Sequence, residues 1–333
     1  MDNLHHIVVV GGGAGGLELA TRLGNKLGKK RKARITLVDA GLTHVWKPLL
    51  HEVASGSLDA NANEINYRAH ARKHHYEFQL GRMNGLDHNA REVIIAPFHD
   101  EDGGEVVPER RIGYDTLVIA VGSTANDFGT PGAQDHCLFL DSLNQARRFH
   151  NLMLNAFLRK NHDAQSGNGH ELPITIIGAG ATGVELAAEL RLASRELPIY
   201  GMNHLRPEDV SITVVEAADR ILPALPARLS EAATRELDHQ NVRVMTGEPV
   251  SEVRDGVVRT VLRGPPNPFA ADEHTVEVPL TVYVDSAHGV ARIDVGDEHA
   301  VVRAVLTGAG GTPRNRQRQR CPEPWWPPGF ASP

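Results

Sequence analysis

Gly11-Gly12-Gly13-Ala14-Gly15-Gly16 follows the apolar residues 7–10 and precedes a helical pattern. A second stretch, Gly178-Ala179-Gly180-Ala181-Thr182-Gly183, follows the apolar residues 174–177 in the same way. Each fits the pattern G-x-G-x-x-G between a strand and a helix, which is typical of a dinucleotide-binding unit. The first glycine permits a tight turn, the second lets the backbone approach a pyrophosphate, and the third lets the helix pack on the sheet. The predicted fold class is therefore α/β, with two Rossmann-like dinucleotide-binding domains.

Each glycine motif is followed by a strand that ends in a carboxylate. Asp39 ends a strand predicted at residues 35–39, and Glu216 ends one at residues 210–216. A carboxylate in this place accepts hydrogen bonds from the ribose hydroxyls of a dinucleotide and repels a 2′-phosphate. Glu216 therefore favours NADH over NADPH, although the nearby Arg220 weakens that preference. Asp39 has the alternative of being only a turn residue at a strand end. Two such sites predict a flavoprotein with FAD in its first domain and NADH in its second.

Bulk composition indicates a globular enzyme and excludes several other classes. A chain of 333 residues is long enough for two domains, and its 41% hydrophobic and 23% charged residues are close to a globular average. The net charge of −6 provides no general attraction to nucleic acid. No apolar stretch is long enough to span a bilayer. We therefore expect a cytoplasmic protein with no nucleic-acid partner and no bound metal.

The cysteines restrict the redox chemistry. There are two, Cys137 and Cys321, far apart in the sequence. Disulfide-reductase flavoenzymes need a cysteine pair beside the flavin to pass electrons to a disulfide. The first predicted domain holds no such pair, so dithiol chemistry is not expected.

A third motif is Tyr114-Asp115-Thr116-Leu117-Val118-Ile119-Ala120-Val121-Gly122-Ser123. It predicts a buried parallel strand whose end approaches a ligand, and it resembles the Y-D-x-L-V-I-A-x-G-S segment of the two-dinucleotide-binding flavoproteins. Residues 42–54 and 178–190 are similar to bacterial type II NADH dehydrogenases, the single-subunit, non-proton-pumping NADH:quinone oxidoreductases. The first of these reads Leu42-Thr43-His44-Val45-Trp46-Lys47-Pro48-Leu49-Leu50-His51-Glu52-Val53-Ala54. The resemblance runs from about residue 5 to about residue 253, and it implies the pyridine nucleotide-disulfide reductase-like fold.

The same resemblance implies which residues contact the cofactors. The residues implied for the ADP half of FAD are Gly11, Gly13, Gly16 and Asp39. Those implied to lie against the isoalloxazine ring or line the FAD side of the domain junction are Lys47, Pro48, Leu49, Ala120, Val121 and Gly122. Those implied for NADH are Gly178, Gly180, Gly183 and Glu216. Glu185 matches a family glutamate near the nicotinamide, with an exposed helix carboxylate as the alternative. Lys47 has the alternative of a surface lysine before a proline turn.

The chemistry implied by the resemblance belongs largely to the cofactors. NADH gives hydride to flavin N5, and the reduced flavin passes two electrons to a quinone. Glu185 and Lys47 are the candidate catalytic residues; Lys47, or a backbone N–H near Pro48, would stabilise negative charge on the flavin. The implied partners are NADH, a quinone acceptor, a membrane surface at the cytoplasmic face of the inner membrane, and a second copy of the chain in a homodimer. The anchoring segment of the family is not seen in this sequence.

The family pattern is not recognised beyond about residue 254. In the superfamily, strands that return after the NADH domain complete the FAD domain and include an A-x-G-D segment. The only Gly-Asp here is Gly296-Asp297, in a pattern that favours an edge strand and turn. Residues 312–333 are rich in proline and arginine, which predicts disorder. A change of reading frame near residues 254–265 would explain this atypical C-terminal part, and without returning strands the first sheet would expose an edge.

These observations predict a four-part plan. Residues 1–135 form the N-terminal part of the FAD-binding domain, 136–250 the NADH-binding domain, 251–311 a divergent and poorly packed segment, and 312–333 a disordered tail. The predicted function is an NADH:quinone oxidoreductase. One alternative is a non-catalytic dinucleotide-binding fragment, and a weaker one is an NADH-dependent flavoprotein reductase with a soluble acceptor.

Overall fold

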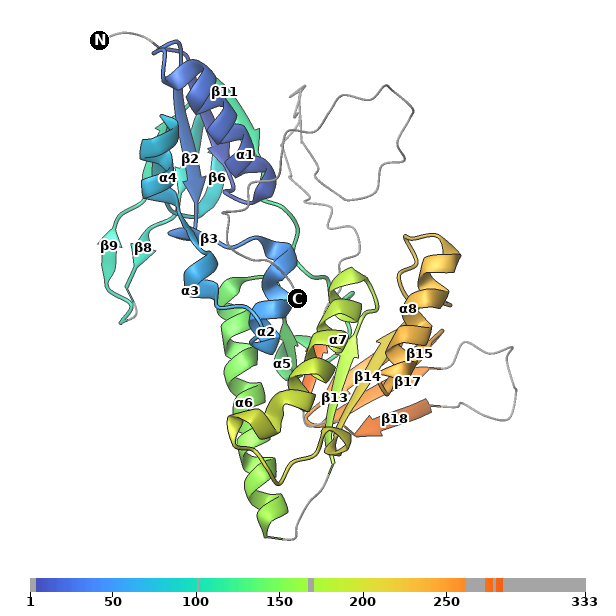
Figure 1. Ribbon diagram of the computed structural model, residues 1–333. Coiled ribbons are helices and arrows are strands. Elements are labelled where there is room, and N and C mark those ends of the chain that lie inside the picture. Colours follow the sequence, from blue (N-terminus) through green and yellow to red (C-terminus); the bar gives the residue numbers. More distant parts are fainter. Residues whose placement is uncertain (1–3, 101, 167–170, 262–272, 278–279, 284–333) are drawn as a thin grey trace.

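The computed structural model describes residues 4–100, 102–166, 171–261, 273–277 and 280–283 (Figure 1). These residues form two lobes, each built around one parallel sheet. The α/β class and the two Rossmann-like halves predicted from the glycine motifs are confirmed.

The first parallel sheet has the strand order β11-β1-β2-β5. Its strands are β1 (His6–Val10), β2 (Arg34–Asp39), β5 (Glu77–Leu80) and β11 (Thr116–Ile119). Helix α1 (Ala14–Leu23) connects β1 to β2, and α4 (Tyr67–His74) precedes β5. The run of valines in β1 is continuous because β1 is a central strand, and Val8 and Val9 are fully buried. Within the described residues, β11 forms one edge of this sheet and β5 the other.

The second parallel sheet has the order β12-β19-β13-β14-β15. Its strands are β12 (Cys137–Phe139), β13 (Leu172–Ile177), β14 (Val210–Glu216), β15 (Val242–Thr246) and β19 (Leu280–Tyr283). Its helices are α6 (Leu143–Gln165), α7 (Ala181–Glu196) and α8 (Ala227–His239). Helix α7 follows β13 and thus takes the place that α1 has after β1.

Each half also carries a three-stranded antiparallel sheet. In the first half it consists of β6 (Met83–Asp87), β7 (Glu92–Ile95) and β10 (Arg110–Gly113). In the second half it consists of β16 (Val250–Arg254), β17 (Val257–Val261) and β18 (Glu273–Glu277). After each of these sheets the chain returns beside the strand that precedes the glycine loop of its own half, β11 next to β1 and β19 next to β13. The two halves therefore repeat one topology.

The expectation of a poorly packed segment after residue 250 is wrong for the described residues 251–261, 273–277 and 280–283. Val253 and Val258 are buried, and β19 pairs in parallel with both β12 and β13. A domain boundary at residue 250 therefore leaves out a strand of the second sheet. Sequence periodicity did not reveal β19, because a strand of four residues is recognised only from its neighbours. Residues 284–333, including Gly296-Asp297 and the proline- and arginine-rich tail, lie outside the described residues, and the change of reading frame stays a prediction.

Short elements connect these sheets. A hairpin predicted around residues 100–104 is present as β8 (Phe98–His99) and β9 (Glu105–Val107). Strands β3 (Thr43–His44) and β4 (Ile65–Asn66) pair with each other. The short helices are η1 (Gly24–Gly28), η2 (Lys47–Leu49), α2 (Leu50–Ser55), α3 (Ala60–Asn63), α5 (Ala133–His136), η3 (Leu197–Tyr200) and η4 (Pro207–Asp209).

Helix α2 comes from the first half of the chain but packs into the core of the second half. Leu50, Val53 and Ala54 of α2 are almost fully buried, and they share a hydrophobic cluster with side chains of α6 and α7. The partners on α6 and α7 include Phe149, Met153, Leu186 and Leu190. Figure 1 shows α2 beside α6 and α7, away from the first sheet. This packing brings η2 and α2, residues 47–55, to the junction between the two halves.

Replacing Leu50 by alanine is expected to lower the free energy of unfolding by about 2–5 kcal/mol, because Leu50 is only 2% exposed and its loss leaves a cavity between the halves. Urea denaturation followed by circular dichroism measures this loss. The control is Leu42→Ala, where the side chain is 47% exposed and little change is expected. Equal effects of the two substitutions would contradict the packing of α2.

Candidate functional site

The first glycine loop has the geometry of a dinucleotide site. Gly11 has φ +101°, and a Cβ there would collide with the carbonyl oxygen of Ala120 at the end of β11. A Cβ on Gly16 would collide with the carbonyl oxygen of Gly11, so the third glycine is needed for the close packing of α1 on the loop. Gly13 differs, because the space where its Cβ would lie is open. The structure therefore leaves room beside the second glycine, where a pyrophosphate would approach the backbone.

The second glycine loop repeats this arrangement. Gly178 has φ +102°, and a Cβ on Gly183 would collide with the carbonyl oxygen of Gly178. Gly13 and Gly180 are the N-caps of α1 and α7, and neither of these fully described helices has a side-chain cap or an acidic residue in its first turn. Free N–H groups and the positive end of the helix dipole therefore face each loop, which favours a phosphate group.

The two strand-end carboxylates hold their loops in the same way. Asp39 accepts hydrogen bonds from the N–H of Gly12 at 2.6 Å and from that of Gly41 at 2.8 Å. Glu216 accepts from the N–H of Ala179 at 2.8 Å and from that of Ala218 at 2.8 Å. Each carboxylate thus caps the turn after its strand and also reaches the glycine loop. An ionised carboxylate has about four lone-pair sites, so acceptor capacity remains for ribose hydroxyls.

The side chain of Tyr67 binds the first glycine loop, and no sequence motif predicts this contact. Its hydroxyl donates to the carbonyl oxygen of Gly12 at 2.7 Å, and the side chain is 2% exposed. Burial, with a contribution from Asp39, raises the pKa of the Tyr67 hydroxyl, which therefore stays a donor. Asn66 caps the helix that starts at Tyr67 by accepting from the N–H of Ala69 at 3.1 Å. Burial likewise lowers the pKa of nearby His44, which favours its neutral form.

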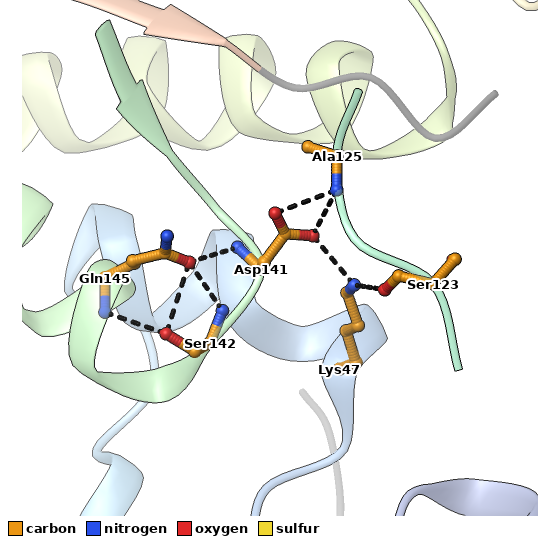
Figure 2. A network of polar contacts seen from close by, with 6 residues as sticks. All are labelled: Lys47, Ser123, Ala125, Asp141, Ser142 and Gln145. Carbon is orange, nitrogen blue, oxygen red and sulfur yellow. Dashed lines mark hydrogen bonds and ion pairs between the residues drawn. The ribbon is translucent and has the colours of Figure 1, made fainter. Parts of the chain in front are cut away.

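Lys47 lies at the junction in a network of polar contacts (Figure 2). Its ammonium donates to the carbonyl oxygen of Ser123 at 2.7 Å and to Oδ1 of Asp141 at 2.8 Å. The carboxylate of Asp141 also accepts from the N–H of Ala125, at 2.9 Å to each oxygen. The network joins η2 to the segment that crosses from β11 into the second half. Lys47 is half exposed and paired with Asp141, and its place against the flavin ring stays a prediction.

Asp141 owes its position to the start of α6. The side-chain oxygen of Gln145 accepts from the N–H of Asp141 at 2.8 Å and from that of Ser142 at 3.0 Å. The hydroxyl of Ser142 accepts in turn from the N–H of Gln145, which completes a capping box (Figure 2). The spacing of Ser142 and Gln145 in the sequence is a signal for this helix start. The ion pair with Lys47 has no such signal, because its partners are far apart in the chain.

Glu185 projects from α7 toward the first half. Its side chain is half exposed, and Oε2 lies 3.5 Å from Nδ1 of the buried His51 on α2. Pro48 and Leu49 lie in η2, directly before α2. Gly122, after β11, has φ +73° and open space where a Cβ would lie. The structure thus brings Lys47, Pro48, Leu49 and Glu185 to the junction, while Gly11, Gly13, Gly16 and Asp39 form one loop site and Gly178, Gly180, Gly183 and Glu216 the other.

Cys137 is a buried free thiol. It lies in β12, 8% exposed, and burial, with a contribution from Asp127, raises its pKa to about 12. A thiolate is therefore disfavoured. Cys321 lies outside the described residues. Within the described ranges, no group of three or more His, Cys, Asp or Glu side chains is arranged to hold a metal ion. No helix among these residues is long and apolar enough to cross a membrane.

The chain is similar to a family of redox enzymes. The sequence model of the family described as "Pyridine nucleotide-disulphide oxidoreductase" matches residues 5–282. The type II NADH:quinone oxidoreductase of Haemophilus influenzae is 42% identical over 269 residues, which are 77% of this chain and 61% of that protein. The mitochondrial external alternative NAD(P)H-ubiquinone oxidoreductase B1 of Arabidopsis thaliana is 31% identical, over 63% of this chain and 37% of that protein. The chain thus spans less than two thirds of the length of these relatives.

Solved structures agree on the fold. NDH2 from Plasmodium falciparum in complex with NADH superposes with a TM-score of 0.71, at 20% identity, over 84% of this chain and 55% of that one. The sulfide:quinone oxidoreductase of Aquifex aeolicus gives a TM-score of 0.61, at 17% identity, over 84% of this chain and 58% of that one. The family match continues to residue 282, beyond the end near residue 253 that we expected. The extra residues include β17, β18 and most of β19.

Two alanine substitutions in the first loop are expected to act differently. Gly16→Ala should lower the free energy of unfolding by about 1–3 kcal/mol, because its Cβ meets the backbone of Gly11. Gly13→Ala should cost less than about 1 kcal/mol as a change of N-cap residue, but it should weaken flavin binding about tenfold or more by filling the open space. Denaturation of the flavin-free protein and titration with FAD measure the two effects. A Gly13→Ala variant that binds FAD normally would contradict a pyrophosphate at this loop.

Proposed function

The chain belongs to the pyridine nucleotide-disulphide oxidoreductase family, and from this premise we propose that it is a type II NADH:quinone oxidoreductase. It would pass hydride from NADH to FAD and electrons on to a membrane quinone without pumping protons. The observation that carries the proposal is the pair of matched loops, in which Asp39 binds the N–H of Gly12 and Glu216 binds that of Ala179. Relatives named NADH:quinone oxidoreductases support the choice of donor and acceptor.

The residues of the first loop fit the ADP half of FAD. The open space beside Gly13 and the uncapped start of α1 suit a pyrophosphate. The carboxylate of Asp39 lies within hydrogen-bond reach of the same loop and suits the ribose hydroxyls. The flavin ring would then extend toward η2 and the end of β11, where Lys47, Pro48, Leu49, Ala120 and Gly122 are placed.

The residues of the second loop fit NADH. Gly180 begins α7 without a side-chain cap, which suits the NADH pyrophosphate. Glu216 accepts hydrogen bonds from two backbone N–H groups, which place its carboxylate charge beside the loop. That charge favours a ribose with a free 2′-hydroxyl over one with a 2′-phosphate. We therefore propose NADH as the electron donor.

The protein groups at the junction would position the reactants and stabilise charge. When bound, the flavin accepts a hydride from NADH and delivers two electrons to the quinone. Lys47, held by Asp141 and the Ser123 carbonyl group, would keep a positive charge close to the flavin ring. Glu185 would keep a negative charge close to the nicotinamide, which becomes positive as hydride leaves. The buried Cys137, with its raised pKa, does not support a disulfide as electron acceptor.

The names of the relatives suggest further partners. A quinone acceptor implies contact with a membrane, so we propose peripheral association at the cytoplasmic face of the inner membrane. A homodimer remains a prediction of the family resemblance alone.

Spectroscopy of the purified full-length chain tests the proposed function. We expect bound flavin near one per chain, bleaching of its absorbance by NADH without oxygen, and recovery on addition of a short-chain ubiquinone. Colourless protein that NADH still stabilises against heat would instead support the dinucleotide-binding fragment. Flavin that ferricyanide reoxidises but ubiquinone does not would support the reductase with a soluble acceptor.

Glu216→Gln should reduce the discrimination between NADH and NADPH about tenfold, equivalent to roughly 1.4 kcal/mol. The substitution removes the charge that repels a 2′-phosphate, so KM for NADPH should fall while KM for NADH rises. Steady-state kinetics with both donors measures the ratio. The control is Glu231→Gln on the exposed surface of α8, which should leave the ratio unchanged. An unchanged ratio in Glu216→Gln would argue against the proposed place of the adenosine ribose.

A further inference from the structure

The imidazole of His51 is buried at the junction with one nitrogen unpaired. His51 is 8% exposed, and its Nδ1 is buried without a hydrogen-bond partner among the described residues. The acids beside the ring are Glu185, with Oε2 3.5 Å from Nδ1, and Glu52, with Oε1 4.0 Å from Nε2. A buried polar atom without a partner is unfavourable, so such atoms in folded proteins call for an explanation.

The pair joins the two halves of the protein. His51 lies on α2, immediately after η2 with Lys47, Pro48 and Leu49. Glu185 lies on α7, in the second turn after the N-cap Gly180 of the second glycine loop. Helix α2 packs against both α6 and α7, so this contact spans the place where the two proposed cofactors would meet.

The side chains of His51 and Glu185 differ in how freely they can move. His51 is fixed, because its neighbours Leu50 and Val53 are buried in the shared core. The side chain of Glu185 is 51% exposed, and it can turn on its own rotamers without disturbing the core. At 3.5 Å the contact is too long for a good hydrogen bond, and a small rotation of Glu185 would close it. His51 is thus a rigid donor facing a movable acceptor.

We propose that His51 is a positioning residue for Glu185. With its proton on Nδ1, the imidazole donates to the Glu185 carboxylate and holds it beside the nicotinamide half of NADH. This inference rests on the proposed function and adds to it a residue from the first half of the chain. It explains why a histidine stands at a buried position of α2, where an apolar side chain would pack without an unpaired nitrogen.

The expected effect is on rate more than on binding. A carboxylate held close to the nicotinamide stabilises the positive charge that appears as hydride leaves, and that charge is absent from bound NADH before the reaction. A carboxylate that turns away into water loses most of this effect, because water screens it. Loss of His51 should therefore slow hydride transfer and leave NADH affinity nearly unchanged.

The test uses the flavin-loaded full chain and stopped-flow reduction by NADH without oxygen. His51→Leu removes the donor and should slow flavin reduction at saturating NADH about tenfold, because the activation barrier rises. The dissociation constant for NADH should change less than about twofold, and reoxidation by a short-chain ubiquinone should keep its rate. His51→Asn places an amide N–H where Nδ1 lies and should restore most of the lost rate.

Three further variants separate positioning from structure. Glu52→Gln alters the acid beside the other ring nitrogen and should leave flavin reduction unchanged. Glu185→Ala should slow reduction, and the double variant His51→Leu/Glu185→Ala should be no slower than Glu185→Ala alone. Flavin content and melting temperature of each variant show whether it folds. If His51→Leu does not fold, the comparison of His51→Asn with His51→Gln, which places its amide near Nε2 instead, decides the question.

Several outcomes would overturn the inference. Multiplying effects of His51→Leu and Glu185→Ala would show that the two residues act independently. If His51→Asn reduces flavin as slowly as His51→Leu, the donor at Nδ1 is not responsible for the rate. If His51→Leu does not fold, the same conclusion follows when His51→Asn is as slow as His51→Gln. Normal reduction in His51→Leu would overturn the inference alone, while unvaried protein that NADH does not reduce would overturn the proposed function as well.

Discussion

The burial of one short helix joins the two halves of this protein. Helix α2 (Leu50–Ser55) inserts Leu50, Val53 and Ala54 between α6 and α7, so that residues from the first half complete the core of the second. Burial of side chains of the size of Leu50 and Val53 contributes about 1.5–3 kcal/mol each. The orientation of α2 brings two pairs of charged or polar side chains together. Lys47, just before it, meets Asp141, and His51, within it, meets Glu185.

The two glycine loops are built alike because they solve the same steric problem. In each, the first glycine has a positive φ and the third lies too close to the first for a side chain. In each, a strand-end carboxylate accepts from the N–H of the second residue of the loop. The repeat extends to the sheets, since β11 and β19 both return to lie beside the strand that precedes the glycine loop of their half. The second half has a further strand, β12, on the far side of β19, while β11 is an edge within the described residues.

Most of the local structure could be predicted from the sequence. The strands and helices around both loops, Asp39 and Glu216 at their strand ends, and the hairpin between Phe98 and Val107 all follow from periodicity and turn residues. The predicted end of the second half at residue 250 was wrong. Strand β19 (Leu280–Tyr283) is short and is recognised only from its pairing with β12 and β13. Tyr67, His51 and Asp141 were not predicted as site residues, since nothing adjacent to them in the chain indicates what they contact.

The sequence by itself determined the class of protein and the two dinucleotide loops, because glycine spacing, apolar strands and strand-end acids act over a few residues. Only the tertiary structure decided what lies between the loops. Lys47 and Asp141, like His51 and Glu185, are about a hundred residues or more apart in the chain, and they meet because burial of α2 outweighs the entropy of closing that long loop. The entropy cost of closing a loop grows only slowly with its length. Burial of a small apolar helix is therefore enough to form a junction that no local sequence pattern predicts.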